Sequence, residues 1–393
     1  MSIGPIPYGR QSISAADIAT VAEVLSGDWV TQGPAVERFE QALAERLGAR
    51  YAVAVSSGTA ALHLACAAAG VSEGDRVITS PNTFVASSTC GVLCGAEPSF
   101  VDIDPRTYNI DPDVLDSALG RTSNIGGVLV PVHFAGQPCD MERISDAAAR
   151  HSLTVIEDAC HAIGATWSDQ SGQVYRVGDC SHSDMTCFSF HPVKHITTGE
   201  GGAILTNRSD LYYRLIRLRS HGITKAPRDW DQPDEGPWYY EMQDLGFNYR
   251  ITDFQCALGL AQLQKLDRWV EKRRAIASRY DDVLGQVDAI VIPYQAPFSD
   301  SSYHLYPVTF TGDAANRRRE VFETMRIAGI GVQVHYIPVH LQPYYARTHG
   351  FAMGDFPVAE SYYERCLSLP IYPDLSRKEQ EYVISILLKA IEC

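Results

Sequence analysis

A single lysine, Lys194, stands between a short apolar run and a glycine-rich turn, within residues 188–202. Histidines lie three residues before it and immediately after it. Lysine is rarely fully buried without a partner, so a lysine in a strand–loop setting needs a reason. One reason is an amine that forms a Schiff base with a carbonyl cofactor, of which pyridoxal phosphate (PLP) is the commonest. A solvated loop lysine is the other, and this stretch alone leaves both open.

Two carboxylates, Glu157 and Asp158, end a second apolar run at residues 153–156. A carboxylate at the end of a buried strand requires a partner. The protonated pyridine nitrogen of PLP would serve, because the ion pair keeps the ring able to accept electrons. A structural salt bridge, or a metal site beside His161, is the alternative. His161 could instead donate to the phenolic oxygen of the cofactor, or be a solvated loop histidine.

Small and hydroxyl residues occur where a phosphate could be held. Ser57, Gly58 and Thr59 lie between an apolar strand and a helix, where hydroxyls and backbone N–H groups can bind an anion. Simple N-capping by Ser57 is the alternative interpretation. Ser189, five residues before the lysine, could reach the same phosphate. Phe84 could stack on a flat ring or belong to the core. In combination and in this order, these motifs predict a PLP site.

The elements that must position these residues alternate between short apolar strands and helices from residue 51 onward. Such strands are nearly all apolar when both faces of the sheet are covered. The alternation predicts an α/β fold with a mostly parallel central sheet and flanking helices. Functional residues would then meet beyond the carboxyl ends of the strands. The predicted strands are residues 51–55, 76–80, 99–103, 127–133, 153–158, 186–190 and 202–206.

A long helical pattern over residues 253–287 predicts one connecting helix between two domains. After it we expect a smaller C-terminal α+β domain, with strands at 303–311 and 331–336 and helices at 314–328, 357–367 and 376–391. The predicted domains are therefore residues 1–250, which comprise the N-terminal arm and a large PLP-binding domain, and residues 251–393.

The composition and charge of the chain limit the classes of partner that it can be expected to bind. The 393 residues carry a net charge of −14, which argues against a nucleic-acid or anionic-membrane surface. No apolar run approaches a membrane span, and no secretory signal is visible, so we expect a cytoplasmic protein with reduced thiols. The spacing from Cys180 through His182 to Cys187 fits no usual zinc site, and no metal is predicted.

The motifs resemble those of a known family. The chain is similar to the DegT/DnrJ/EryC1/StrS sugar aminotransferases, which are fold-type I PLP-dependent transferases. The resemblance covers nearly the whole chain. Its motifs are TQG at residues 31–33, SGTAALH at 57–63, EDACHA at 157–162, FSFHPVK at 188–194, GEGG at 199–202 and GFNYR at 246–250.

The resemblance implies a role for each matching residue. Lys194 would be the catalytic lysine that holds PLP and later moves the proton. Asp158 would pair with the pyridine nitrogen, His161 with the ring oxygen, and Phe84 would cover the ring. Gly58, Thr59 and Ser189 would hold the phosphate, and Ser57 would also contact the cofactor. Asn248 would reach the phosphate of the neighbouring subunit's cofactor, which makes a homodimer the working unit. Nucleotide-sugar contacts are expected from Tyr8, Asp28, Trp29, Val30, Thr31, Ser57, Ser189, Asn248, Gln333, Val334, His335 and Tyr336.

Within the family, HPVK at 191–194, ITTGEGG at 196–202 and QVHYIP at 333–338 are most similar to transaminases of the pseudaminic acid pathway. That similarity implies transfer of an amino group from L-glutamate to C4 of a UDP-linked 2-acetamido-2,6-dideoxy-4-keto-hexose. Another nucleotide-linked 4- or 3-keto-deoxy sugar is the alternative substrate. His195 departs from the proline expected after the lysine, and the sequence assigns it no role.

Three other classes of protein fit less well. The sugar dehydratases of this family replace the lysine with histidine, so Lys194 argues against them. An NAD-dependent sugar enzyme would need a Gly-x-Gly-x-x-Gly turn after the strand at 51–55, and none follows it. A sugar-binding protein that had lost catalysis would not be expected to keep Lys194, Asp158 and Ser189.

Overall fold

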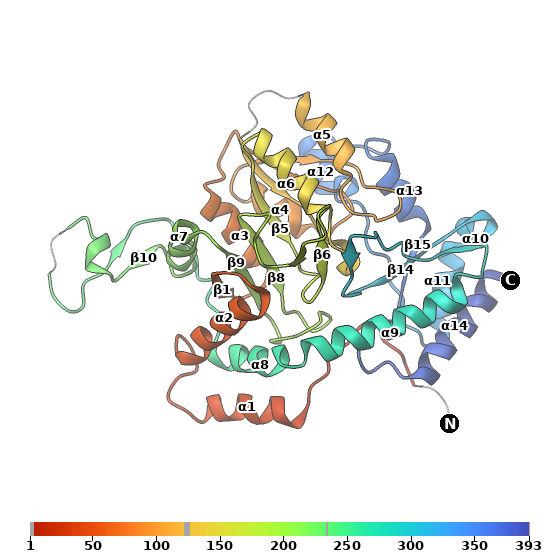
Figure 1. The fold of residues 1–393 in the computed structure, drawn as a ribbon, viewed down its shortest axis with the longest axis horizontal. Helices are drawn as coiled ribbons and strands as arrows, with labels where there is room; N and C mark the ends of the chain where they lie inside the picture. The colour runs from red at the N-terminus through yellow and green to blue at the C-terminus, as the bar shows by residue number, and fades with distance from the viewer. Residues whose placement is uncertain (1–3, 122–125, 233–234, 393) are drawn as a thin grey trace.

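The structure is a computed structural model that describes residues 4–121, 126–232 and 235–392. Its centre is a seven-stranded sheet (Figure 1). In order across the sheet, the strands are β1 (Tyr51–Val55), β9 (Gly202–Thr206), β8 (Met185–Ser189), β5 (Thr154–Asp158), β4 (Gly127–Val130), β2 (Arg76–Thr79) and β3 (Glu97–Phe100). The five strands from β8 to β3 run parallel, and β9 is antiparallel to both of its neighbours. The mostly parallel α/β sheet predicted from the sequence is confirmed.

Helices cover both faces of this sheet. Because strand side chains alternate, Val53 and Val55 enter one core while Ala52 and Ala54 enter the other. The first face is covered by α3 (Gly58–Ala69), α4 (Ala86–Val92) and α7 (Ser209–Arg219). The second is covered by α2 (Pro34–Leu47), α5 (Pro112–Gly120), α6 (Met141–Arg150) and α8 (Asp253–Leu263). Burial on both sides explains why the strands are almost entirely apolar.

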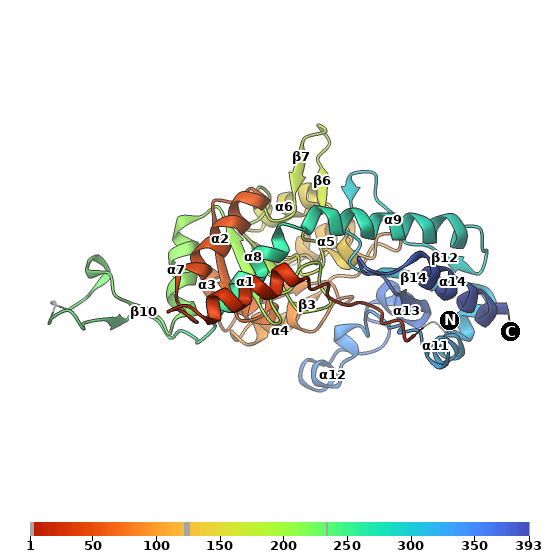
Figure 2. The same ribbon diagram turned by 90° about the horizontal axis from the view of Figure 1, so that it is seen from below.

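A smaller antiparallel sheet has a core of its own. Its strands are β12 (Ile290–Val291), β14 (Tyr306–Phe310) and β15 (Cys366–Leu369). Around it lie α9 (Leu266–Leu284), α10 (Gly312–Asn316), α11 (Arg318–Ile327), α13 (Pro357–Arg365) and α14 (Arg377–Glu392). Helix α12 (Pro343–His349) projects from the body (Figure 2), and its Tyr345 packs against Phe100 of β3. Ile6 of the N-terminal arm is buried in this second core, where its segment pairs with Ile330.

The predicted continuous helix 253–287 is wrong, because the structure has two helices there. The first, α8, ends at Leu263, and α9 begins at Leu266. At the break, the Lys265 ammonium contacts Oδ1 of the buried Asp17 at 2.6 Å, in α1 (Ala15–Leu25). Apolar periodicity continues through the break and gives no sign of this tertiary contact. Helix α9 still joins the two cores, since Trp269 packs in the first and Tyr280 in the second.

Three further predictions differ in the C-terminal region. The predicted helix 314–328 is two helices, α10 and α11, with Arg317 between them. The predicted strand 331–336 forms only an isolated bridge between Gln333 and Ser368. The predicted helix 357–367 ends at Arg365, and the next four residues form β15. All four are buried, and periodicity alone cannot distinguish a short buried strand from a helix segment.

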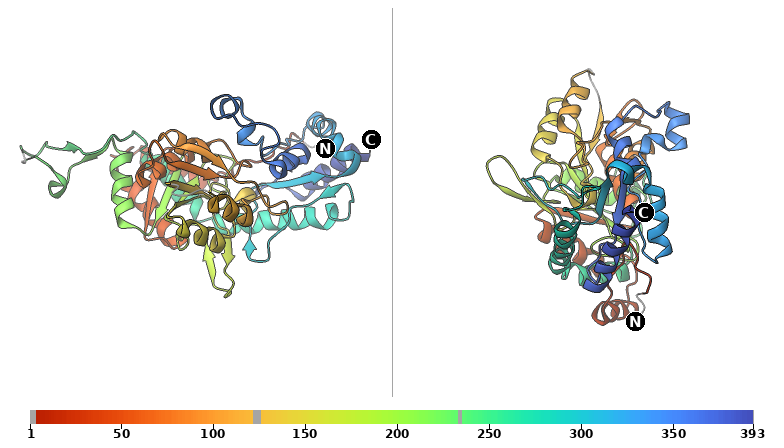
Figure 3. Two further views of the ribbon diagram at one scale, coloured as in Figure 1. Left: turned by 90° about the horizontal axis from the view of Figure 1, so that it is seen from above. Right: turned by 90° about the vertical axis from the view of Figure 1, so that its right-hand side faces the viewer.

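Two pairs of short strands extend from the body. The strands β6 (Thr166–Ser168) and β7 (Val174–Arg176) form a hairpin, on which β13 (Ser299–Asp300) adds a third strand (Figure 2). An arm that contains β10 (Ile223–Thr224) and β11 (Glu241–Met242) projects far from the sheet (Figures 1 and 3). Within the described residues, no helix is long and apolar enough to cross a membrane.

Candidate active site

A cavity of about 620 Å³ lies where the sequence motifs meet. Asp158 ends β5 and Ser189 ends β8, so the cavity lies at the carboxyl ends of the parallel strands. Of the predicted site residues, it is lined by Tyr8, Ser57, Gly58, Thr59, Phe84, Asp158, His161, Ser189, Lys194, His335 and Tyr336. The tertiary fold therefore gathers residues from six separate stretches of the chain.

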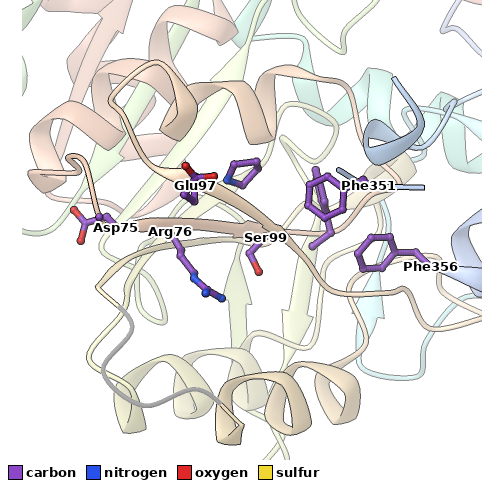
Figure 4. Close-up of a pocket in the computed structure, with 9 residues that line it drawn as sticks. Asp75, Arg76, Glu97, Ser99, Phe351 and Phe356 are labelled. Atoms are coloured by element: carbon purple, nitrogen blue, oxygen red, sulfur yellow. The ribbon is translucent and has the colours of Figure 1, made fainter. Parts of the chain in front are cut away.

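A second cavity, of about 490 Å³, lies beside β2 and β3 (Figure 4). Arg76 and Glu97, which begin these two strands, line it together with Phe351 and Phe356. It contains none of the predicted site residues, and the amino ends of the strands are the unusual place for a ligand in an open α/β sheet. The first cavity is therefore the candidate active site.

Lys194 is half-buried in the loop that follows β8, rather than solvated. Its Nζ lies 3.4 Å from Nε2 of His304, a residue that the sequence did not point to. Burial lowers the pKa of Lys194, while the nearby Cys160 and Asp158 act in the opposite direction. A lowered pKa gives a larger fraction of neutral amine, which is the nucleophilic and basic form.

Asp158 is buried, and its carboxylate faces the cavity. Ser87 donates to its Oδ2 at 2.6 Å, and the backbone N–H of Cys160 donates to its Oδ1 at 3.1 Å. Among the described residues, no basic side chain forms an ion pair with it. A buried carboxylate that has donors but no cation is suited to a cationic ligand group.

The neighbouring carboxylate, Glu157, has a different environment. Its Oε2 lies 2.7 Å from Nε2 of His133, and Thr186 donates to its Oε1 at 2.8 Å. Burial raises the pKa of Glu157, but these contacts outweigh burial and leave that pKa lowered overall. Glu157 thus fits the structural salt bridge that the sequence left open, and Asp158 is the carboxylate available to a ligand.

The turn before α3 brings two predicted phosphate-binding segments together. The Ser57 hydroxyl accepts from the backbone N–H of Ala60 at 3.0 Å, so it caps the helix. A Cβ added to Gly58 would lie 2.7 Å from Cβ of Ser189, so a glycine is needed for this close approach. The N-terminus of a twelve-residue helix and the Ser189 hydroxyl therefore meet at one edge of the cavity, where an anion is favoured.

Aromatic and imidazole rings also line the cavity. Nε2 of His161 lies 3.1 Å from the hydroxyl of Tyr336, and its buried Nδ1 has no partner among the described residues. Burial lowers the pKa of His161 well below its usual value, and Lys194 lowers it further. Phe84 is 56% exposed at the mouth, with its ring centroid 6.3 Å from that of Tyr336.

Some predicted residues lie outside the cavity lining of this single chain. The segment containing Asp28, Trp29, Val30 and Thr31 is exposed, and its backbone pairs with residues 252–253 at the start of α8. Asn248 is exposed next to the arm, where its backbone pairs with that of Ser220. Gln333 and Val334 directly precede His335 in the chain but do not line the cavity. Their roles stay predictions.

Other residues at the site were not predicted. Two of them, Ser87 and His304, contact Asp158 and Lys194 without lining the cavity. The others line it: Ser56, Leu62, Thr83, Ala86, Val132, Cys160, His191, Val193 and Glu200. Cys160 and His191 belong to motifs that had been recognised, so adjacency could have suggested them. Nothing in the local sequence around Ser87 or His304 indicates that either residue reaches the site.

The residues present fit PLP. The carboxylate of Asp158 lacks a cationic partner, as a pyridinium requires, and the unpartnered Nδ1 of His161 is a polar atom without a protein contact. The turn at Gly58 has no room for a side chain beside Ser189, so the residue there is a glycine and a phosphate can approach the backbone N–H groups at the start of α3. The amine of Lys194 lines the same cavity.

Comparison with known proteins supports this fit. The family model of the DegT/DnrJ/EryC1/StrS aminotransferase family matches residues 11–388. The chain is 39% identical over 382 residues to the spore coat polysaccharide biosynthesis protein SpsC of Bacillus subtilis, covering 96% of this chain and 95% of that protein. It is 37% identical over 390 residues, 98% of each, to the UDP-4-amino-4,6-dideoxy-N-acetyl-beta-L-altrosamine transaminase of Campylobacter jejuni.

Solved structures of similar proteins have the same fold, and two of them are the PLP and PMP forms of one protein. The chain is similar to Helicobacter pylori PseC, an aminotransferase involved in the biosynthesis of pseudoaminic acid, with a TM-score of 0.89, 29% identity and 99% of both chains covered. It is also similar to the putative sugar aminotransferase Spr1654 of Streptococcus pneumoniae in its PLP form, with a TM-score of 0.89, 28% identity and 99% of both chains covered. The PMP form of that protein matches equally well in TM-score, at 0.89, with 30% identity over 98% of this chain and 99% of that one. The chain belongs to the DegT/DnrJ/EryC1/StrS aminotransferase family and is a sugar aminotransferase whose cofactor is pyridoxal phosphate.

Proposed function

We propose that the protein transfers the amino group of L-glutamate to C4 of a UDP-linked 2-acetamido-2,6-dideoxy-4-keto-hexose, as in pseudaminic acid biosynthesis. The observation that carries the proposal is the shared cavity of Lys194 and the cation-free carboxylate of Asp158. The choice of sugar is supported by the likeness to the Campylobacter jejuni transaminase and to PseC.

Each residue of the site would have a defined task. PLP, when bound, supplies a carbonyl carbon that binds amines and a ring that accepts electrons. Asp158 would keep the ring nitrogen protonated, and His161 would bond the ring oxygen. Gly58, Thr59 and Ser189 would hold the phosphate at the N-terminus of α3. Phe84 would cover the ring at the mouth of the cavity and exclude water.

Lys194 would move the proton in both half-reactions. Burial lowers its pKa, so the neutral amine can take a proton from Cα of glutamate. The product 2-oxoglutarate leaves, and the amino group stays in the site. In the second half-reaction, Nζ would deliver a proton to C4 of the keto-sugar when the amine is transferred there. One group serves both directions because the two steps are the reverse of each other.

The nucleotide sugar would bind at the open side of the cavity. Tyr8, His335, Tyr336, Ser57 and Ser189 all line this cavity. We propose that the segment Asp28, Trp29, Val30 and Thr31, together with Gln333 and Val334, completes the sugar site. The net charge of −14 fits a small-molecule substrate bound by a few local groups, rather than nucleic acid.

We further propose a homodimer in which Asn248 reaches the cofactor of the neighbouring subunit. In support, the projecting arm exposes large apolar side chains, among them Trp238 at 73%, Met242 at 60% and Leu245 at 82%. Such groups mark interaction surfaces. A cytoplasmic location is proposed because all nine described cysteines are free, as expected in a reducing compartment.

A second candidate substrate is another nucleotide-linked 4- or 3-keto-deoxy sugar. SpsC, which is 39% identical, is named for spore coat polysaccharide biosynthesis. Loop residues around the sugar can change specificity without changing Lys194 or Asp158.

The test is an assay with isotope-labelled glutamate and the UDP-linked 4-keto sugar, followed by mass spectrometry of the sugar product. The proposed function predicts transfer of the labelled nitrogen and bleaching of the visible cofactor band by glutamate alone. Lys194→Ala should abolish turnover and that band, and a variant that keeps both would refute the role of the lysine. Transfer only to a different keto sugar would establish the alternative substrate.

A further inference from the structure

Beyond the residues assigned above, a buried histidine lies against the catalytic lysine. His304 is only 4% exposed, and its Nε2 lies 3.4 Å from Nζ of Lys194. It comes 110 positions later in the chain, just before β14. Its ring also packs on His161, with centroids 4.4 Å apart. His304 therefore contacts the two groups that face the cofactor position.

His195, to which the sequence assigned no role, holds the backbone next to His304. Its Nε2 lies 2.9 Å from the carbonyl oxygen of Ser302. A carbonyl can only accept, so Nε2 of His195 is the protonated nitrogen. The Ser302 hydroxyl donates in turn to the carbonyl of His161 at 3.3 Å. The 301–304 segment is thus tied to the lysine loop on one side and to the His161 turn on the other.

Arg273 of α9 also holds the 301–304 segment in place. This fully buried side chain donates through Nη1 to the carbonyls of Tyr303 and His304, at 3.2 Å each, and of Ile371, at 2.9 Å. Burial lowers the pKa of Arg273 to about 9. The backbone position of His304 is therefore set by contacts from three separate parts of the chain.

The charges around His304 keep its ring neutral. The titratable groups that face it are Lys194, His161, His195 and Arg273, and all of them are basic. Burial lowers the pKa of His304 well below its usual value, and these four groups lower it further. A neutral imidazole with Nδ1 protonated presents an unprotonated Nε2, which is an acceptor for an N–H of the lysine.

We propose that His304 is a positioning residue for Lys194, whose Nζ donates a hydrogen bond to Nε2 of His304, and that His195 maintains this contact through Ser302. The inference rests on the proposed role of Lys194 as the proton-transfer group. In that role the contact holds the amine at one place in the cavity between the two half-reactions, instead of leaving a flexible side chain to find its position at each turnover.

The test compares His304→Gln with His304→Phe. The Gln amide oxygen can take the place of Nε2 as an acceptor, whereas Phe keeps the ring volume and removes the acceptor. In the full-length protein stripped of cofactor, acylation of Lys194 by limiting acetic anhydride is followed against pH by peptide mass spectrometry. The exposed Lys378 serves as the internal reference in every sample.

An acceptor stabilises the ammonium form, so its removal lowers the pKa of the lysine. We expect His304→Phe to lower the apparent pKa of Lys194 by about one unit, a tenfold change in the protonated fraction. His304→Gln should stay close to the wild type. With cofactor present, the rate of bleaching by glutamate should fall roughly tenfold in the Phe variant and be largely retained in the Gln variant.

Other outcomes overturn the proposal. A Phe variant that matches the wild type, or equal changes in the Phe and Gln variants, would show that His304 only fills space. Should His304→Phe not fold, His304→Ala replaces it, and added imidazole must then restore the apparent pKa of Lys194. A wild type that is not bleached by glutamate would contradict the proposed function, while the acylation measurement would still decide the contact between His304 and Lys194.

Discussion

The hydroxyl of Ser87 donates a hydrogen bond of 2.6 Å to Oδ2 of Asp158, which joins α4 to the end of β5. Both side chains are buried, and the Thr83 hydroxyl lies 2.7 Å from that of Ser87. The donors orient the carboxylate toward the cavity without neutralising it. The charge of Asp158 is therefore kept for a ligand cation, and Ser87 becomes part of the cofactor site although it is not in the cavity lining.

Ser87→Ala should weaken PLP binding by about tenfold to a hundredfold, because a hydrogen bond to a charged group contributes roughly 1.5–3 kcal/mol. The measurement is a titration of the cofactor-free protein with PLP, followed by visible absorbance. Thr79→Val is the matched control, because it removes an equally buried hydroxyl that donates to the carbonyl of Val130 at 2.7 Å, outside the cavity. Unchanged PLP affinity in Ser87→Ala would contradict this role.

Gly58→Ala should disrupt the phosphate cradle. The new Cβ would lie 2.7 Å from Cβ of Ser189 and 3.0 Å from its Oγ, so either the helix start or β8 must move. We expect a destabilisation of about 1–3 kcal/mol from overpacking and a clear loss of PLP affinity. Thermal unfolding and PLP titration measure the two effects.

Gly120→Ala is the matched control for that change. Gly120 ends α5 with nothing within 4 Å of an added Cβ. Alanine is the better helix former, so this variant should be neutral or slightly stabilised. If the two alanine variants bound PLP equally well, the close approach at Gly58 would have no importance for the cofactor.

His335 should make the folded protein sensitive to acid. Burial lowers the pKa of His335 to about 3, and Lys194 adds to this shift, while the unfolded value is near 6.5. Between these two pH values the unfolded chain binds a proton that the folded chain does not. The free energy of unfolding therefore falls as the pH drops through this window, by about 1.4 kcal/mol per pH unit for this residue.

His335→Asn removes that titration and keeps a side-chain group near the hydroxyl of Ser368, which lies 2.9 Å from Nδ1 of His335. Urea unfolding at a series of pH values should give a shallower decline between pH 6.5 and about 3 than in the wild type. His221→Asn, the same substitution at an exposed site, is the control variant. Equal slopes in His335→Asn and the wild type would rule out a contribution from His335.

Mixing two inactive variants tests whether subunits share their sites. Lys194→Ala and Asn248→Ala should each be nearly inactive alone. If Asn248 serves the neighbouring cofactor, a mixed dimer contains one intact site, and random exchange should restore about a quarter of the wild-type activity. The measurement is glutamate-dependent turnover after dissociation and reassociation. No recovery, in a mixture whose exchange is verified by mass, would place Asn248 in the site of its own chain.

Much of this protein could be predicted from the sequence, because the signals are local. Strands such as residues 51–55 and 202–206 were predicted at their observed bounds, since burial on both faces requires continuous apolar runs. Asp158 ends such a strand, the Ser57–Thr59 turn comes just after another, and Lys194 lies five residues beyond a third, so the flanking elements indicate all three. The order of these motifs then predicted the cofactor, and the family matched.

The tertiary structure decided what depends on contacts between distant segments. The break between α8 and α9, with Lys265 on Asp17, and the pairing of β15 with β14 leave no mark in the periodicity. In the same way Ser87 meets Asp158 across 71 positions and His304 meets Lys194 across 110. The sequence by itself determined the groups to which we assign the chemistry, because their types and flanking elements are local properties. Only the folded chain determined which groups hold them in place, because packing can bring any two segments together.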